Sequence, residues 1–305
     1  MLGLFKKKLK PKWEFTKPGN LWRAMFLADS NKIIGEHRGQ TEKKASFFLL
    51  DNATGSLVWD NFVLLHSGGP NSGKLVGDGW WIGLEMIYKH LVLLHSYVDP
   101  SVPEHMGLWA LDSNTKSISW ERPDISFISM TRDNKILAYK EILVGGFAER
   151  SFVLLDPMTG EELENLGQDG HRATLLRDQS FGLDESQEVN LPTQYTEKTE
   201  GFAEVIEAVQ KHSNLQRVIA GFDIIHQNDR IILGYHEQTN MLVNTQAGVP
   251  VKSLNYTIKV IESDKVVFED IIGKGMSGLL MDGFFTRNGH LYYVRERDTL
   301  CCIEV

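Results

Sequence analysis

Polar side chains that could bind a ligand follow the second strand of each of five repeated segments. The strand ends read Glu36-His37-Arg38, His95-Ser96, Lys140-Glu141, His236-Glu237 and Arg295-Glu296. If the segments are related by rotation, equivalent strand ends share one face, where imidazole and cationic groups can hold an anionic molecule. We therefore expect ligand-binding roles for His37, His95, Lys140, His236 and Arg295. The alternative is that these residues are polar only because the strands end in solvent.

Carboxylates near the predicted innermost strands form a second set, which could hydrolyse a sugar bond. The set is Asp78, Glu85, Asp223 and Asp282. Glycosidases need two carboxylates, one as acid and one as base or nucleophile. Counted back from the turn residue of each repeat, the four lie 12, 5, 7 and 8 positions away, so their register is not equivalent. Ligand binding by Asp78, Asp223 and Asp282 is expected, whereas the catalytic residues of an enzyme stay unassigned.

The histidines do not predict a metal centre. The chain has 10 of them, and no two have the spacing of paired ligands on a common helix or turn. We also find no cofactor-binding motif. The expectation is therefore a protein with neither metal nor cofactor.

A turn motif that occurs three times indicates the elements that must position these residues. The three copies are Leu50–Trp59, Leu111–Trp120 and Leu155–Glu164. Each reads as strand, turn and strand, with an Asp that can bind turn backbone groups and, in two copies, a Gly suited to positive φ. Two copies end in Trp59 and Trp120, which we expect to dock against a neighbouring repeat. Repetition at this spacing predicts a stacked or closed array of β-sheets.

The repeats predict an all-β fold, a five-bladed β-propeller in a single domain of residues 1–305. The expected blades are residues 19–62, 78–122, 125–167, 215–272 and 277–305. A strand at residues 12–16 is expected to close the last blade, which removes exposed sheet edges. Residues 168–214 form an insertion between blades three and four. Apolar residues at helical spacing between Glu200 and Lys211 predict one short helix within it.

The pattern Asp51-x-x-Thr54-Gly55-x-x-x-Trp59 resembles the repeat of the pyrroloquinoline-quinone-type propellers. That family includes quinoprotein dehydrogenases and non-catalytic outer-membrane assembly scaffolds, and its Trp packs between adjacent blades. Here the second copy has Lys116 in place of Gly and the third has Glu164 in place of Trp. No cofactor-site motif of the family maps onto this shorter chain, so the resemblance implies the fold and not the cofactor. The layout is also similar to uncharacterised bacterial propeller families of unknown function.

Composition narrows the class of protein. The net charge of −8 argues against nucleic acid as the main partner, and the one dense basic run, at residues 6–12, reads as a solubilising tail or a membrane-surface patch. No transmembrane segment or signal peptide is predicted. Cys301 and Cys302 are adjacent and so are expected to be reduced, which fits a cytoplasmic location.

The favoured function is a non-enzymatic scaffold for a protein partner or a small anionic ligand; the alternative is a glycan-processing enzyme.

Overall fold

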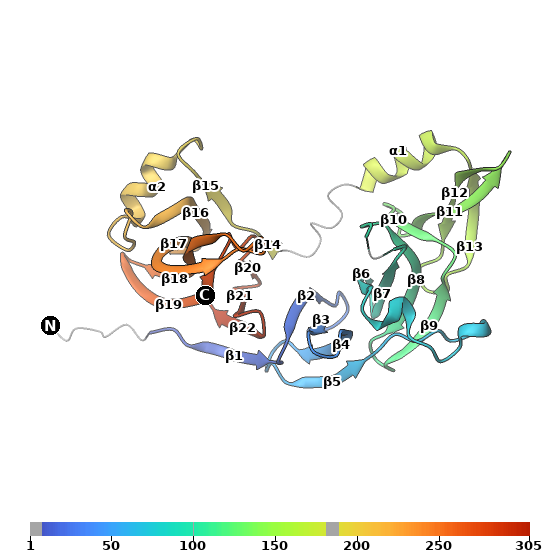
Figure 1. Cartoon of the computed structure of the whole chain (residues 1–305), viewed down its shortest axis with the longest axis horizontal. Coiled ribbons are helices and arrows are strands. Elements are labelled where there is room, and N and C mark those ends of the chain that lie inside the picture. The colour runs from blue at the N-terminus through green and yellow to red at the C-terminus, as the bar shows by residue number, and fades with distance from the viewer. Residues whose placement is uncertain (1–7, 100, 181–188) are drawn as a thin grey trace. The chain divides into compact units, whose positions relative to one another are not determined.

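The computed structural model describes residues 8–99, 101–180 and 189–305, and within them the chain forms five antiparallel sheets and two α-helices (Figure 1). These residues form two compact units, residues 19–180 and residues 8–18 with 189–305. Lys6, Lys7 and residues 181–188 of the predicted insertion lie outside the described residues. None of the described helices is long and apolar enough to span a membrane.

The unit of residues 19–180 contains three sheets of four strands, and each sheet uses strands that are consecutive in the chain. The first sheet is β2 (Asn20–Phe26), β3 (Lys32–Gly39), β4 (Lys44–Asp51) and β5 (Leu57–Phe62). The second is β6 (Ile82–Tyr88), β7 (Leu91–Tyr97), β8 (His105–Asp112) and β9 (Ser117–Arg122). The third is β10 (Ser126–Met130), β11 (Ile136–Val144), β12 (Phe147–Leu155) and β13 (Glu162–Gly167). Two 3₁₀ turns, η1 (Gly69–Asn71) and η2 (Val76–Gly79), precede β6.

The second unit contains two sheets of five strands. One has the order β15 (Thr193–Tyr195), β16 (Val218–Gln227), β17 (Arg230–Asn244), β18 (Pro250–Glu262) and β19 (Lys265–Met276). The other has the order β1 (Pro11–Thr16), β22 (Thr299–Glu304), β21 (His290–Arg295), β20 (Phe284–Arg287) and β14 (Val189–Asn190). The first strand of the chain thus pairs with the last, and Trp13 lies opposite Cys302. Both cysteines are free and buried.

Two helices occupy the region where the sequence predicted one. α2 (Phe202–Val209) coincides with the predicted helix and buries Val205 and Val209. α1 (Gly170–Ser180) was not predicted. Among the residues of this helix, only Ala173 is buried. Such a helix carries no apolar stripe for a periodicity argument to detect.

The repeated turns form as the residue types require. The Asp51 carboxylate accepts hydrogen bonds from the backbone N–H groups of Ala53 and Thr54, at 3.0 and 2.9 Å. Gly55 then takes a positive φ of 71°, a region that costs a side-chain-bearing residue steric energy. The second copy places Lys116 at φ 56° instead, so its turn keeps the same shape without glycine.

The tryptophans that follow these turns connect neighbouring sheets. Trp59 of the first sheet donates from Nε1 to the carbonyl of Ser113 in the second sheet, at 2.9 Å. Trp120 of the second sheet donates to the carbonyl of Pro157 in the third, at 3.2 Å. Both side chains are half-buried. Each indole therefore fixes the turn of the following sheet as well as filling space between sheets.

Candidate functional site

A buried ion pair joins the first and second sheets of residues 19–180. Glu36 and Arg38 are two residues apart on β3, so their side chains share a face. Arg38 donates from Nε to Glu36 Oε1 at 2.7 Å, and both residues are almost completely buried. Arg38 also donates to the carbonyls of Trp80 and Ile82, at 2.7 and 2.8 Å. Glu36 Oε2 accepts from the N–H of Leu84 at 3.2 Å, so both members of the pair reach across to the next sheet.

An aromatic cavity of about 370 Å³ lies beside this ion pair. We call it the tryptophan pocket; its walls are Trp22, Arg38, Gln40, Trp80, Trp81, Tyr97 and the segment 101–103. The Arg38 guanidinium lies 5.2 Å from the ring centres of both Trp22 and Trp80. Trp81 and Tyr97 meet edge to face, with ring centres 6.0 Å apart. Trp22 is 63% exposed, so the pocket presents an indole directly to solvent.

Tyr97 also contacts a second group of residues, the histidine–carboxylate cluster of Glu85, His95 and His105. The Tyr97 ring centre lies 5.3 Å from that of His95 and 5.1 Å from that of His105. The two imidazoles stack at 3.5 Å, with an interplanar angle of 7°. Glu85 Oε2 is 2.8 Å from His105 Nδ1 and 2.9 Å from His95 Nδ1. Tyr97 therefore lines the tryptophan pocket on one side and contacts the cluster on the other.

Strand register brings the cluster together. Gly83 on β6 lies directly opposite His95 on β7, and Tyr97 on β7 lies opposite His105 on β8. Glu85 is the extra residue where the β6–β7 register shifts between Leu84 and Met86. Bulges of this kind redirect a side chain, and they recur next to functional sites. A β-carbon on Gly83 would lie 3.0 Å from His95 Nε2, so the missing side chain makes room for the imidazole.

Burial and charge set the protonation states of the cluster. Burial raises the pKa of Glu85, but the imidazoles of His105 and His95 outweigh it and hold that pKa at about 2. Burial lowers the pKa of His95 from its ordinary value, while the neighbouring Glu85 opposes this shift. Glu85 is therefore an anion at neutral pH, and burial favours the neutral form of the His95 imidazole.

The unit of residues 189–305 brings three other predicted residues near one another. Tyr256 donates from its hydroxyl to Asp223 Oδ2 at 2.6 Å, and its ring centre lies 4.6 Å from that of His236. Burial raises the pKa of Asp223, and the charge of Asp282 raises it further. His236 Nε2 accepts a hydrogen bond from the N–H of Leu280 at 2.8 Å, and burial lowers its pKa to about 4. We call these four residues, Asp223, His236, Tyr256 and Asp282, the aspartate cluster.

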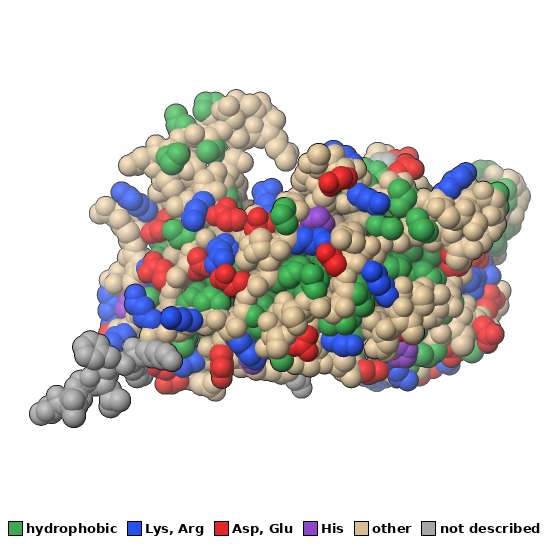
Figure 2. Space-filling model, turned by 90° about the horizontal axis from the view of Figure 1, so that it is seen from below, with side chains coloured by type: hydrophobic (Ala, Val, Ile, Leu, Met, Phe, Trp, Pro, Cys, Tyr) green, Lys and Arg blue, Asp and Glu red, His purple; other side chains and the backbone are tan. Residues whose placement is uncertain are grey.

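The remaining predicted ligand residues lie outside these clusters, and the charges of two of them are paired with carboxylates. His37 lies on the face of β3 opposite to Glu36 and Arg38, 3.4 Å from Ser46. Lys140 pairs with Glu162 at 2.7 Å, and Arg295 pairs with Glu14 and Asp270, each at 3.0 Å. Asp78 is exposed in η2. Acidic and basic side chains are intermixed on the face in Figure 2, rather than gathered by sign.

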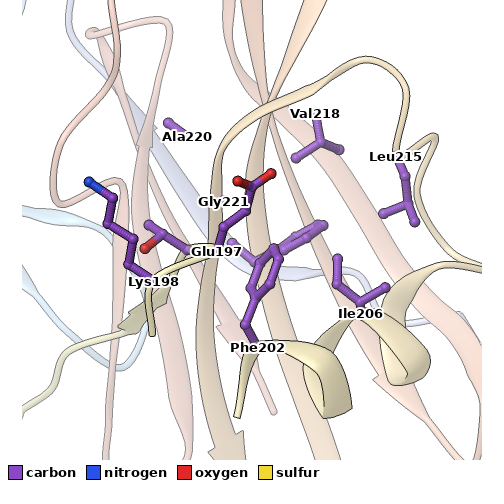
Figure 3. A pocket seen from close by; sticks show the side chains of 10 residues that line it. Glu197, Lys198, Phe202, Ile206, Leu215, Val218, Ala220 and Gly221 are labelled. Atoms are coloured by element: carbon purple, nitrogen blue, oxygen red, sulfur yellow. The ribbon is translucent and has the colours of Figure 1, made fainter. Parts of the chain in front are cut away.

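A second cavity, of about 590 Å³, lies against α2 (Figure 3). Phe202 and Ile206 of the helix point toward Val218 and Leu215 across it, while Glu197 and Lys198 lie at its other end. Its lining is thus apolar with a charged rim. Among the described residues that line it, no buried ion pair like that of Glu36 and Arg38 occurs.

The sequence analysis named some residues of this candidate site. The strand-end pattern included Glu36, Arg38 and His95, and the carboxylate set included Glu85. The sequence analysis missed His105 and all the aromatic residues of the tryptophan pocket. The available signal was the equal spacing of Glu85, His95 and His105, ten residues apart along three strands of one meander.

One family model matches part of the chain. Residues 28–120, less than half of the chain, match the model of a domain of unknown function, DUF4905. None of the curated proteins matches the sequence.

Several solved structures are similar to the chain at low identity. One is a member of the DUF4221 family from Bacteroides vulgatus, with 8% identity, 97% of both chains covered and a TM-score of 0.30. The β-propeller domain of the Trilobed protease from Pyrococcus furiosus has 13% identity, with 90% of this chain and 68% of that chain covered and a TM-score of 0.31. A bifunctional GH43-CE protein from Bacteroides eggerthii has 10% identity, with 97% and 34% covered and a TM-score of 0.28.

Proposed function

We propose that the protein is a non-enzymatic ligand-binding β-propeller and that its ligand is a neutral carbohydrate held in the tryptophan pocket. The observation that carries this proposal is a pocket with three tryptophans and a tyrosine beside an arginine whose charge is already neutralised. Its volume, about 370 Å³, is in the range of small-molecule sites.

The aromatic walls favour a ligand that has a flat apolar face. Indole and phenol rings offer large rigid surfaces that lose little conformational entropy on binding. The C–H face of a sugar ring packs on such a surface, and its hydroxyl groups at the ring edge need hydrogen-bonding partners. Gln40 and Ser101 line the same pocket and can supply them.

Charge balance favours a neutral ligand over the anion expected from the strand-end pattern. The Glu36 carboxylate neutralises Arg38, and two backbone carbonyls take further guanidinium N–H groups. An anion that approached Arg38 would have to compete with these buried partners. His95, the other cationic candidate nearby, lies beside the Glu85 carboxylate.

Isothermal titration with a panel of neutral mono- and oligosaccharides tests this function. We expect at least one saccharide to bind with one site per chain, and Trp81→Ala to weaken that binding at least about tenfold, or ~1.4 kcal/mol. Trp120→Ala is the matched control, because Trp120 lies at a turn between sheets and not in the pocket. If sugar phosphates or other anions bind and every neutral saccharide fails, the proposed ligand class is wrong.

We also propose that the five sheets are the blades of one five-bladed propeller in the cytoplasm. The meander order of four sheets, and of β20 to β22 in the fifth, supports this arrangement, as does the pairing of β1 with β22. The relationship to pyrroloquinoline-quinone-type repeats stays a prediction. Small-angle scattering of the purified protein tests the ring, since a closed disc and two separate lobes differ in their distance distributions.

The aspartate cluster favours a second candidate function, a glycan-processing enzyme. Asp223 is partly buried with a raised pKa, while Asp282 is exposed, and pairs of carboxylates in unlike environments divide acid and base roles. Hydrolysis of aryl glycosides by the wild-type protein, lost in Asp223→Asn and in Asp282→Asn, would support it. Equal rates in wild type and both variants would exclude catalysis by this cluster.

A further inference from the structure

We propose that Glu85, His95 and His105 bind a divalent transition-metal ion, with zinc as the best fit to the donor set. The proposal is independent of carbohydrate binding, because none of the three side chains lines the tryptophan pocket. It assigns a metal site to a region where sequence spacing predicted none.

The donor atoms have the chemistry and closeness that such a site needs. Two imidazole nitrogens and one carboxylate oxygen, each from a different side chain, lie within 4.8 Å of one another. Two histidines with one carboxylate form a known ligand set for zinc and for other transition metals. Magnesium and calcium prefer oxygen ligands throughout, so this set selects against them.

Metal binding requires the donor atoms to move apart and one imidazole to turn. Glu85 Oε2 lies 2.8 and 2.9 Å from the two Nδ1 atoms, whereas ligands of a tetrahedral zinc ion are roughly 3.3 Å apart. A bound metal lies near the plane of each imidazole, so the two stacked rings cannot both keep their parallel orientation. The His105 side chain is 34% exposed whereas His95 is buried, so His105 is the ring that we expect to turn.

His95 gives the second, independent observation. It is only 3% exposed, and neither ring nitrogen has a well-aligned hydrogen bond among the described residues. A buried polar atom without such a bond destabilises the folded protein, and a metal at Nδ1 would give that nitrogen a directional partner. The far side of the ring faces the space above Gly83, where Glu36 Oε2 also lies close. Metal-bound histidines commonly have a carboxylate in this outer position, which orients the ring.

The site would keep one coordination position open. The described residues supply three ligands, and a tetrahedral ion needs a fourth. Because His105 reaches solvent, water can take that position. Tyr97 lies beside both imidazoles and also lines the tryptophan pocket, so an ion here would lie behind one wall of that pocket.

Titration of the chelator-treated protein with Zn²⁺ and with Co²⁺ tests the proposal. We expect one ion per chain, and a visible absorption spectrum of four-coordinate cobalt. His105→Ala and Glu85→Gln should each weaken zinc binding at least about tenfold. His90→Ala is the matched control, since His90 is a half-exposed histidine in the turn of the same sheet and should bind zinc as the wild type does.

Thermal unfolding keeps the test decisive if a variant is less stable. Zinc in excess should raise the melting temperature of the wild type and of His90→Ala, but not that of His105→Ala. Failure of the wild type to bind either ion stoichiometrically would overturn the proposal. So would zinc affinity within about twofold of wild type in both His105→Ala and Glu85→Gln. Saccharide titration of the same proteins separates this failure from failure of the carbohydrate proposal.

Discussion

Arg38 and Glu36 form a buried ion pair in which Nη2 and Oε1 are 2.6 Å apart, and both side chains also bind backbone groups of the neighbouring sheet. One contact therefore has two consequences. It connects the first and second sheets through polar groups that are fully paired. It also leaves the adjacent tryptophan pocket without a bare positive charge, which is why we favour a neutral ligand.

Removal of one member of this pair should destabilise the protein strongly. Glu36→Ala leaves the Arg38 guanidinium buried without its counter-ion, and such changes cost about 3–5 kcal/mol of unfolding free energy. The matched control is Glu162→Ala, which removes the partly exposed partner of Lys140 and should cost less than about 1 kcal/mol. Urea unfolding of the three proteins measures both values. Similar losses in the two variants would mean that the Arg38 pair is not the buried connection described above.

Truncation of a docking tryptophan should also be costly. Trp120 packs against Gly160 so closely that a β-carbon there would lie 2.6 Å from the indole, and its Nε1 binds the Pro157 carbonyl. Because the side chain is half-buried, Trp120→Ala should cost about 2–4 kcal/mol. Phe147→Ala is the control, since Phe147 is 76% exposed and its removal should change stability by less than about 1 kcal/mol. A cost below that value for Trp120→Ala would contradict docking.

These two cases show what the sequence could and could not predict. The all-β fold and the repeated turns were visible because Asp51, Gly55 and Trp59 have local roles that short motifs encode. The Glu36–Arg38 strand end was visible as a polar pair, but its partners at Trp80 and Ile82 belong to another sheet. Such pairings depend on how strands of different sheets meet, and spacing along the chain does not carry that information. Helix α1 was missed for a related reason, since it has no apolar stripe.

The site as a whole was beyond sequence reasoning for similar reasons. Glu85 joins His95 and His105 because a register shift at Leu84 and Met86 turns it toward them. A bulge cannot be placed from alternation of apolar residues alone. The tryptophan pocket draws on β2, the segment after η2 and the end of β7, which have no common motif.

His236 should make the stability of the protein depend on pH. Its pKa in the folded state is about 4, below the value near 6.5 of an unfolded chain, because burial disfavours the charged ring. Between pH 6.5 and 4 the unfolded state therefore binds more protons than the folded state. The free energy of unfolding is accordingly highest above pH 6.5 and decreases as the pH falls through this window. We expect His236→Gln to reduce the loss of stability between pH 7.5 and 4.5 by on the order of 1–3 kcal/mol. If the free energy of unfolding changes with pH to the same extent in wild type and variant, His236 is not the source of this pH dependence.

The most direct test of the proposed function is to observe the indole N–H signals by NMR while a binding saccharide is added. The chain has 7 tryptophans, and Trp22, Trp80 and Trp81 are those that line the pocket. Single Trp→Phe variants assign the signals. We expect saturable shifts of these three indole N–H signals, with those of Trp59 and Trp120 unchanged. Saturable binding that shifts other indoles and leaves these three in place, or no shift with any neutral saccharide, would contradict it.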